Sequence, residues 1–207
     1  MEPGDLAQLM RRIEAAFLFG VDGVTELWLI RHADCYADMT DVLDPPLSQL
    51  GSRQAERVGK RAREAGITEV YSSPSRRAVE TARAITETVN IDPRLVEMEN
   101  NPGEAAKVIM SRYQAFTESP EQVVKRMTEV IDEAVAAHTG ERIAIVGHGV
   151  SQLAYLGSLM RIEFGQLRLF PYYTCVSIVH ALGDRRMVAS LFDFAHVADL
   201  IGAQAPD

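Results

Sequence analysis

The chain has 207 residues, with 21 basic and 29 acidic side chains and a formal net charge of −8. Apolar residues make up 47% and charged residues 24%, which excludes collagen-like, coiled-coil and wholly disordered proteins. The negative charge disfavours nucleic acid as a partner, and no apolar run approaches the roughly 20 residues that cross a bilayer. Two distant cysteines, Cys35 and Cys175, are no disulfide framework and suit a reducing compartment. We therefore expect a single domain over residues 1–207, located in the cytoplasm, with no nucleic-acid or membrane partner.

Residues 5 to 19 are predicted to form a helix, which makes residues 1–20 an N-terminal helical segment. Apolar side chains recur there at the three- and four-residue spacing of one helix face. They are Leu6, Leu9, Met10, Ile13, Ala16 and Phe17. The preferred interpretation is a helix packed against its own domain, and the alternative is a contact in a homodimer.

From residue 25 onward, predicted strands and helices alternate. The expected strands are 25–30, 68–71, 94–98 (or an extended segment) and 142–146, and the expected helices are 49–64, 74–88, 104–116, 120–138 and 149–160. Two β-rich segments, 173–179 and 186–193, follow without a helix between them and are expected to pair. This order predicts a three-layer α/β/α sandwich around a mostly parallel sheet with an antiparallel edge. Residues of about 98–140 interrupt the alternation and are predicted to form a small helical cap insertion over a site.

Basic and imidazole side chains follow three of the predicted strands. Arg31 and His32 come directly after the first strand, and His148 follows the strand 142–146. Arg76 and Arg77 lie in the helix after Ser72-Ser73-Pro74, for which Ser73 is the expected N-cap. Because the carboxyl ends of parallel strands meet at one crevice, these side chains are expected to converge. An acidic protein that gathers cations at one place is predicted to bind an anion, and arginine suits phosphate. The amides that open the helix after His148 are expected to add donors.

A histidine in such a site can transfer protons or attack phosphorus. Histidine is a known covalent nucleophile, and its attacking nitrogen must be unprotonated. Its other nitrogen is therefore expected to donate to a fixed acceptor. Neighbouring arginines lower the pKa of the imidazole and stabilise the negative charge of a transferring phosphoryl group.

Five ordered segments resemble the motifs of one family. They are Leu29-Ile30-Arg31-His32, Asp44-Pro45-Pro46-Leu47-Ser48-Gln49-Leu50-Gly51 with Gln54-Ala55, Ser72 to Ala82 (SSPSRRAVETA), Val146-Gly147-His148-Gly149, and Ser190 to Val197 (SLFDFAHV). Together they resemble the histidine phosphatase superfamily, whose fold is shared with cofactor-dependent phosphoglycerate mutases. The resemblance covers about residues 25 to 197 and implies a phosphoglycerate mutase-like fold.

The resemblance also implies roles for individual residues. His32 would be the catalytic nucleophile that becomes phosphohistidine. Arg31 and Arg77 would bind the phosphoryl oxygens, and His148 would act with them as a catalytic and phosphate-binding donor. Arg77 rather than Arg76 matches the family's arginine, because it stands before Ala78.

The same resemblance implies a general acid before the cap. Glu97 matches the usual carboxylate, which would protonate the leaving oxygen and then help to activate water. Glu99 and Glu104 are competing candidates for this role. No metal ion and no organic cofactor are implied.

The sequence departs from the family pattern at several positions. Ala33 replaces the glycine of the signature, where its methyl group could narrow the approach to the nucleophile. Cys35 and Asp38 stand where phosphoglycerate mutases commonly carry Thr and Asn. The glycine stretch that follows the acid in the family is absent after Glu97. These departures disfavour mutase specificity and leave phosphatase chemistry intact.

The sequence therefore predicts a metal-independent phosphatase that hydrolyses a phosphomonoester of a small or medium substrate through phosphohistidine on His32. One alternative is a phosphoglycerate mutase, which moves a phosphoryl group between hydroxyls. A second alternative is a non-catalytic protein that binds a phosphorylated ligand. The cap is expected to select the substrate, and the sequence does not identify that substrate.

Overall fold

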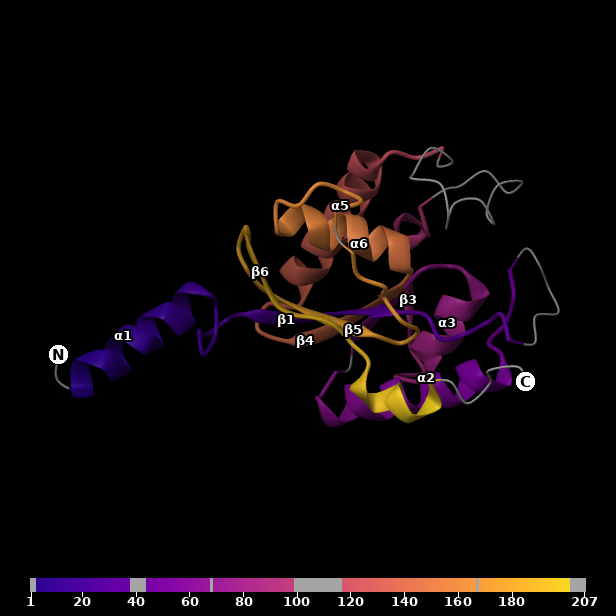
Figure 1. Ribbon diagram of the computed structural model, residues 1–207, viewed down its shortest axis with the longest axis horizontal. Helices are drawn as coiled ribbons and strands as arrows, with labels where there is room; N and C mark the ends of the chain where they lie inside the picture. The colour runs from indigo at the N-terminus through magenta and orange to yellow at the C-terminus, as the bar shows by residue number, and fades with distance from the viewer. Residues whose placement is uncertain (1–2, 38–43, 68, 99–116, 167, 202–207) are drawn as a thin grey trace.

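A six-stranded mixed sheet forms the centre of the computed structural model, which describes residues 3–37, 44–67, 69–98, 117–166 and 168–201 (Figure 1). The strand order is β3-β2-β4-β1-β5-β6. The strands are β1 (Thr25–Arg31), β2 (Glu69–Ser72), β3 (Asn90–Ile91), β4 (Arg142–Gly147), β5 (Val176–Leu182) and β6 (Arg185–Asp193). The first four are parallel, whereas β5 runs antiparallel to β1 and β6 antiparallel to β5. The predicted parallel sheet with an antiparallel edge is confirmed.

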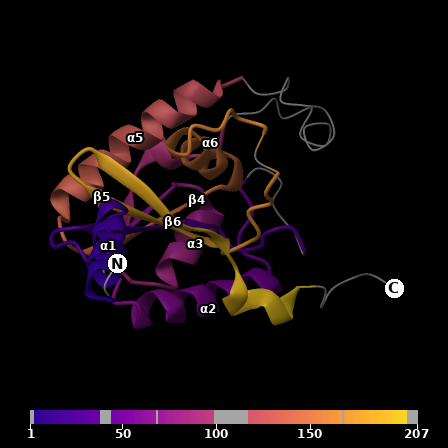
Figure 2. The ribbon, with the colours of Figure 1, turned by 60° about the vertical axis from the view of Figure 1, so that its left-hand side comes forward.

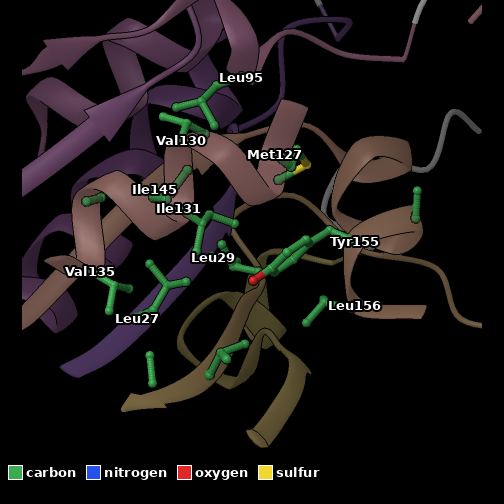
Figure 3. Close-up of a cluster of buried hydrophobic side chains, with 14 of the residues drawn as sticks. Leu27, Leu29, Leu95, Met127, Val130, Ile131, Val135, Ile145, Tyr155 and Leu156 are labelled. Carbon is green, nitrogen blue, oxygen red and sulfur yellow. The ribbon is translucent and has the colours of Figure 1, made fainter. Parts of the chain in front are cut away.

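Helices cover both faces of this sheet, as Figures 1 and 2 show from two directions. One face carries α2 (Gln49–Glu64) and α3 (Arg76–Arg83), and the other carries α5 (Pro120–Ala137) and α6 (Gly149–Leu159). The reason is the strand composition, because β1 and β4 each contain a run of four consecutive apolar residues that is buried on both faces. Alternate residues of β1 point to opposite cores: Leu27 and Leu29 face α5 and α6, whereas Trp28 and Ile30 face α2 and α3. Figure 3 shows the first of these cores.

The second half of the expected cap belongs to the body of the domain. Residues 120–137 form α5, and its apolar side packs into the core over β1 and β4, with Val123, Met127 and Ile131 nearly inaccessible. Ser119 begins the helix in a reciprocal capping box with Gln122. The prediction that residues of about 98–140 form a cap is therefore wrong for α5. The predicted helix 104–116 lies outside the described residues.

Two boundaries differ from the sequence-based expectation. The helix predicted for 74–88 is the shorter α3, whose N-cap is Ser75 and not Ser73. Ser73 has a different partner, because its hydroxyl contacts a histidine of the site described below. Residues 94–98 contain no strand: a 3-10 turn at Pro93–Leu95 leads into extended chain. The strand that pairs with β2 at this edge of the sheet is β3.

The N-terminal helix α1 (Pro3–Ala16) projects away from the rest of the molecule (Figure 1). Every residue from Gly4 to Phe17 is exposed. The preferred interpretation of this helix, packing against its own domain, is therefore wrong. Over the described ranges, no helix combines the length and the apolar character that a bilayer crossing requires.

Candidate active site

Three neighbouring parallel strands deliver the residues of the site from their carboxyl ends. In the sheet register Arg31 lies opposite Gly147, and Ser72 lies opposite Val146. The residues that follow β1, β2 and β4 therefore leave the sheet at one edge. The structure brings His32 and His148 together with their ring centroids 5.2 Å apart. This confirms the expected convergence.

His32 is buried, and its hydrogen bonds assign its tautomer. Nδ1 lies 2.8 Å from the carbonyl oxygen of Ala33, which can only accept, so Nδ1 carries the hydrogen. Nε2 then presents a lone pair, and the Nε–H of Arg77 donates to it over 3.3 Å. This is the arrangement expected of a nucleophilic imidazole, with one nitrogen fixed by an acceptor and the other unprotonated.

His148 is fully buried, and both of its ring nitrogens have partners. Arg77 Nη2 lies 3.3 Å from Nδ1, and a guanidinium can only donate, so Nδ1 accepts. Nε2–H therefore donates to the hydroxyl of Ser73 at 2.8 Å. One arginine side chain thus contacts both histidines. In this arrangement His148 must exchange its bond with Ser73 before it can donate to a phosphate.

Burial and nearby cations keep both imidazoles neutral. Burial, followed by the charges of Arg31 and Arg77, holds the pKa of His32 well below its usual value. Burial also lowers the pKa of His148 well below its usual value, and the adjacent His32 and Arg77 add to the effect. Both rings are consequently unprotonated at neutral pH, so the positive charge of the site resides on its arginines.

One of the N–H groups of the Arg31 side chain has no hydrogen-bond partner among the described residues. Its Nη1 donates to the carbonyl oxygen of Pro171 at 2.6 Å, and its guanidinium lies 4.3 Å from the centroid of the Tyr173 ring. Its Nε is buried and has no hydrogen-bond partner among the described residues. A buried N–H without a partner is costly, and an anion at this place would satisfy it. The geometry therefore fits the phosphate-binding role that the resemblance implies.

The chain around the nucleophile is held by hydroxyl groups. Thr81 accepts from the backbone N–H of Ala33 at 3.0 Å and donates to the carbonyl of Arg77 at 2.7 Å, which joins β1 to α3. Ser48 caps α2 by accepting from the N–H of Gly51, and it donates to the carboxylate of Asp34 at 2.7 Å. These bonds fix the segment that follows His32 from two sides.

The carboxylate of Glu97 lies against the first turn of α6, the helix that begins directly after His148. Its Oε1 accepts from the N–H of Ser151 and of Met98, both at 2.8 Å, and its Oε2 accepts from the N–H of Val150 at 3.1 Å. Two of the amides that were expected to bind phosphate therefore bind this carboxylate instead. Oε2 accepts one such bond whereas Oε1 accepts two. The competing acids, Glu99 and Glu104, lie outside the described residues.

The departures from the family pattern have different outcomes. The methyl group of Ala33 is fully buried, and the backbone of this residue binds both His32 and Thr81. Cys35 is buried, and burial raises the pKa of its thiol, which fits a pocket-wall residue and not a reactive thiol. Asp38 lies outside the described residues.

Sequence reasoning missed three contributors to the site. Ser73 is the hydroxyl partner of His148 and not the helix cap that the local sequence predicts. Asp44 lies 3.7 Å from Arg77 and also accepts from the backbone N–H of Arg76. Tyr173 lies under Arg31 and 6.1 Å from the ring of His32. The position of Ser73 directly after β2 was an available signal, but no spacing connects Tyr173 to the site.

Comparison with known proteins agrees with this geometry. The family model of the histidine phosphatase superfamily (branch 1) matches residues 27–193. The metal-independent phosphoserine phosphatase of Arabidopsis thaliana is 27% identical over 86% of this chain and 85% of its own. A probable phosphoglycerate mutase of Yersinia pestis is 26% identical over 65% of this chain and 74% of its own. The solved structure of Bacillus stearothermophilus YhfR is 25% identical with a TM-score of 0.70, covering 84% of this chain and 99% of that one. The chain is an enzyme that belongs to the histidine phosphatase superfamily.

Proposed function

We propose that this protein hydrolyses the phosphomonoester of a small or medium metabolite through a phosphohistidine on His32, without a metal ion. The observation that carries the proposal is the state of His32. Its Nδ1–H is fixed by a carbonyl and its Nε2 lone pair faces Arg77, while the buried Nε of Arg31 has no partner among the described residues. An uncharged nucleophile next to a cationic N–H that has no partner among the described residues fits attack on a phosphoryl group.

In the first step the Nε2 lone pair forms a bond to phosphorus while the bond from phosphorus to the ester oxygen breaks. Arg31 and Arg77 hold the equatorial oxygens and stabilise the charge that develops on them. Glu97 delivers a proton from Oε2 to the leaving oxygen. In the second step the carboxylate takes a proton from water, and the water oxygen displaces the histidine from phosphorus.

A phosphoglycerate mutase is the second candidate, and the similarity to the Yersinia protein is the observation in its favour. A mutase would return the phosphoryl group to a second hydroxyl instead of to water. The phosphatase is preferred because Cys35 stands where mutases commonly carry Thr. A buried thiol thus takes the place of that hydroxyl group. Interconversion of 3- and 2-phosphoglycerate that depends on a bisphosphoglycerate primer would support the mutase. The non-catalytic alternative is disfavoured because Arg31, His32, Arg77 and His148 are all present at one site.

The direct test is hydrolysis of p-nitrophenyl phosphate by the full chain between pH 4 and 8. We expect turnover that vanadate inhibits and that excess EDTA leaves unchanged, because arginine side chains handle the phosphoryl charge. Loss of turnover with EDTA, restored by a divalent cation, would contradict the metal-independent mechanism.

The acid role of Glu97 predicts a dependence on the leaving group. Glu97→Gln should lower kcat/KM for an alkyl phosphate such as phosphoserine by about 10²- to 10⁴-fold. The same variant should lower kcat/KM for p-nitrophenyl phosphate far less, because p-nitrophenolate leaves without a proton. An equal loss on both substrates would show that Glu97 only positions the start of α6.

The cytoplasm remains the proposed location. Cys35 and Cys175 are both unpaired and buried, which suits a reducing compartment.

A further inference from the structure

The exposed apolar side of α1 is the first feature that the proposed function leaves unused. We define the α1 stripe as five side chains on one face of this helix, each between 42% and 54% exposed: Leu6, Leu9, Met10, Ile13 and Phe17. A helix of 14 residues is marginal in water without packing, so such a stripe requires a covering surface. The family match begins at residue 27, so α1 lies outside the shared catalytic body.

The base of α1 is fixed to the domain. Arg185 donates to the carbonyl oxygen of Ala16 at 2.6 Å, and Leu18 is buried. Phe19 makes an edge contact with the ring of His180 at 4.7 Å. The helix therefore extends from the β5–β6 side of the sheet in a set direction, as Figures 1 and 2 show.

An apolar groove begins where the α1 stripe ends. Its volume is about 420 Å³, and we call it the edge groove. It is lined by Phe17, Leu159, Met160, Met187, Val188 and Leu191, together with three polar or small residues. It lies on the edge strand β6 and the end of α6, and Phe17 belongs to both surfaces. The two surfaces form one continuous apolar face.

We propose that a second copy of this chain covers this face, with the α1 stripe of each protomer packed on the edge groove of the other. A chain that carries both an apolar ridge and an adjoining apolar groove can form a reciprocal two-fold interface. Half-exposed side chains of this size present on the order of 80 Å² each. The five stripe side chains alone thus present about 400 Å² per protomer, half of the roughly 800 Å² per partner of a standard interface, and the edge groove adds further apolar surface.

Charge argues against a membrane as the occupant. The helix carries two acidic and two basic side chains, Asp5, Glu14, Arg11 and Arg12, within a chain of net charge −8. Helices that lie on anionic lipid carry an excess of Lys and Arg on their polar face. A neutral polar face fits a protein surface better.

The test is the oligomeric state of the full chain by analytical ultracentrifugation. We expect a dimer for the wild type and a monomer for the double variant Leu9→Glu with Ile13→Glu, with turnover unchanged. The control is Gln8→Glu, which adds a negative charge to the opposite side of the same helix and should remain dimeric. A photo-crosslinker at position 9 should react with residues 159–191 of the other copy. A monomeric wild type, or equal dissociation by Gln8→Glu, would overturn the proposal.

Aromatic rings around Arg31 support a second, independent inference, which rests on the proposed function. Phe170 is 70% exposed and lies 5.6 Å from the Arg31 guanidinium. Tyr36 is 52% exposed and lies 6.4 Å from Tyr173, whose ring is 6.1 Å from His32. Phe170 and Tyr36 together are called the aromatic rim. Two large rings are thus open to solvent next to the residues that would hold the phosphoryl group.

We infer that the alcohol part of the substrate carries a flat aromatic ring that packs on the aromatic rim. Aromatic pairs gain about 0.5–1.5 kcal/mol beyond the area they bury, which is a factor of roughly two to twelve. Phosphoserine and phosphoglycerate carry no such ring. The rim therefore favours an aryl-bearing phosphomonoester over these small polar esters.

The test compares 2-phenylethyl phosphate with propyl phosphate, because their leaving alcohols have similar acidity. We expect kcat/KM to be about tenfold higher for the phenyl compound. Phe170→Ala should reduce this ratio at least threefold, and Phe170→Tyr, which keeps a ring, should preserve it. The control Phe19→Ala removes an exposed ring beyond the opposite end of β1 and should leave the ratio unchanged.

A ratio near one in the wild type, or a ratio that Phe170→Ala leaves intact, would overturn the aromatic inference. Hydrolysis of both esters at equal rates would still support the phosphatase. Failure to hydrolyse either ester or p-nitrophenyl phosphate would instead contradict the proposed function itself.

Discussion

His32→Ala is expected to abolish turnover, with a loss of kcat of more than about 10³-fold, while the fold survives. The variant removes the only atom proposed to bond to phosphorus, and the remaining arginines can bind a phosphate without cleaving it. A buried histidine replaced by alanine leaves a small cavity, so thermal unfolding should stay cooperative. The measurements are hydrolysis of p-nitrophenyl phosphate and a thermal melt of both proteins.

His138→Ala provides the matched control, because His138 ends α5 and its ring contacts Tyr71 and Glu141 instead of the site. This control should keep near-normal turnover. Residual hydrolysis by His32→Ala at more than a few per cent of the wild-type rate would rule out the covalent mechanism.

Arg77→Gln is expected to lower kcat/KM by roughly 10³-fold, because one guanidinium contacts His32, contacts His148 and is proposed to hold a phosphoryl oxygen. Arg76→Gln is the control at the adjacent position. Arg76 is exposed and pairs with Glu80 at 2.8 Å on the surface of α3. It should change kcat/KM by less than about twofold.

The same pair of variants should separate in their pH dependence. The positive charge of Arg77 is one of the causes that lower the pKa of His32, so its removal raises that pKa. His32 must be unprotonated to attack, and the acid limb of kcat/KM should therefore move to higher pH in Arg77→Gln. Burial and Arg31 continue to lower the pKa, so the shift should be partial. An unmoved acid limb, or an equal movement in Arg76→Gln, would contradict the assigned electrostatics.

The sequence was sufficient to predict the sheet and the convergence of the main residues. Strands β1 and β4 are short apolar runs, and parallel strands necessarily place the residues that follow them at one edge. Arg31, His32 and His148 could thus be brought together from their positions alone, and Arg77 from its place at the start of α3. These features depend on local sequence and on topology.

The contacts of Glu97 could not be predicted in the same way. The resemblance selected this residue, but the amides of Val150 and Ser151 that hold it come from α6, more than 50 residues further along the chain. Ser73 was misplaced for a related reason. A serine before a proline is a common helix cap, and tertiary contact with His148 outweighed that local preference.

The periodicity of the sequence also could not predict what surrounds α1. The spacing of Leu6, Leu9, Met10 and Ile13 establishes an apolar face but does not indicate what covers it. The expected packing on the domain was wrong because α1 projects beyond the amino-terminal end of β1, away from both cores.

The most direct measurement is the trapping of the covalent intermediate. The wild-type protein is mixed with a phosphomonoester and quenched in base within milliseconds, because phosphohistidine is stable in base and labile in acid. Mass spectrometry of the digested chain should find an added phosphoryl group on His32, and none in His32→Ala. Turnover without any phosphorylated residue, or with the phosphoryl group on another side chain, would contradict the mechanism.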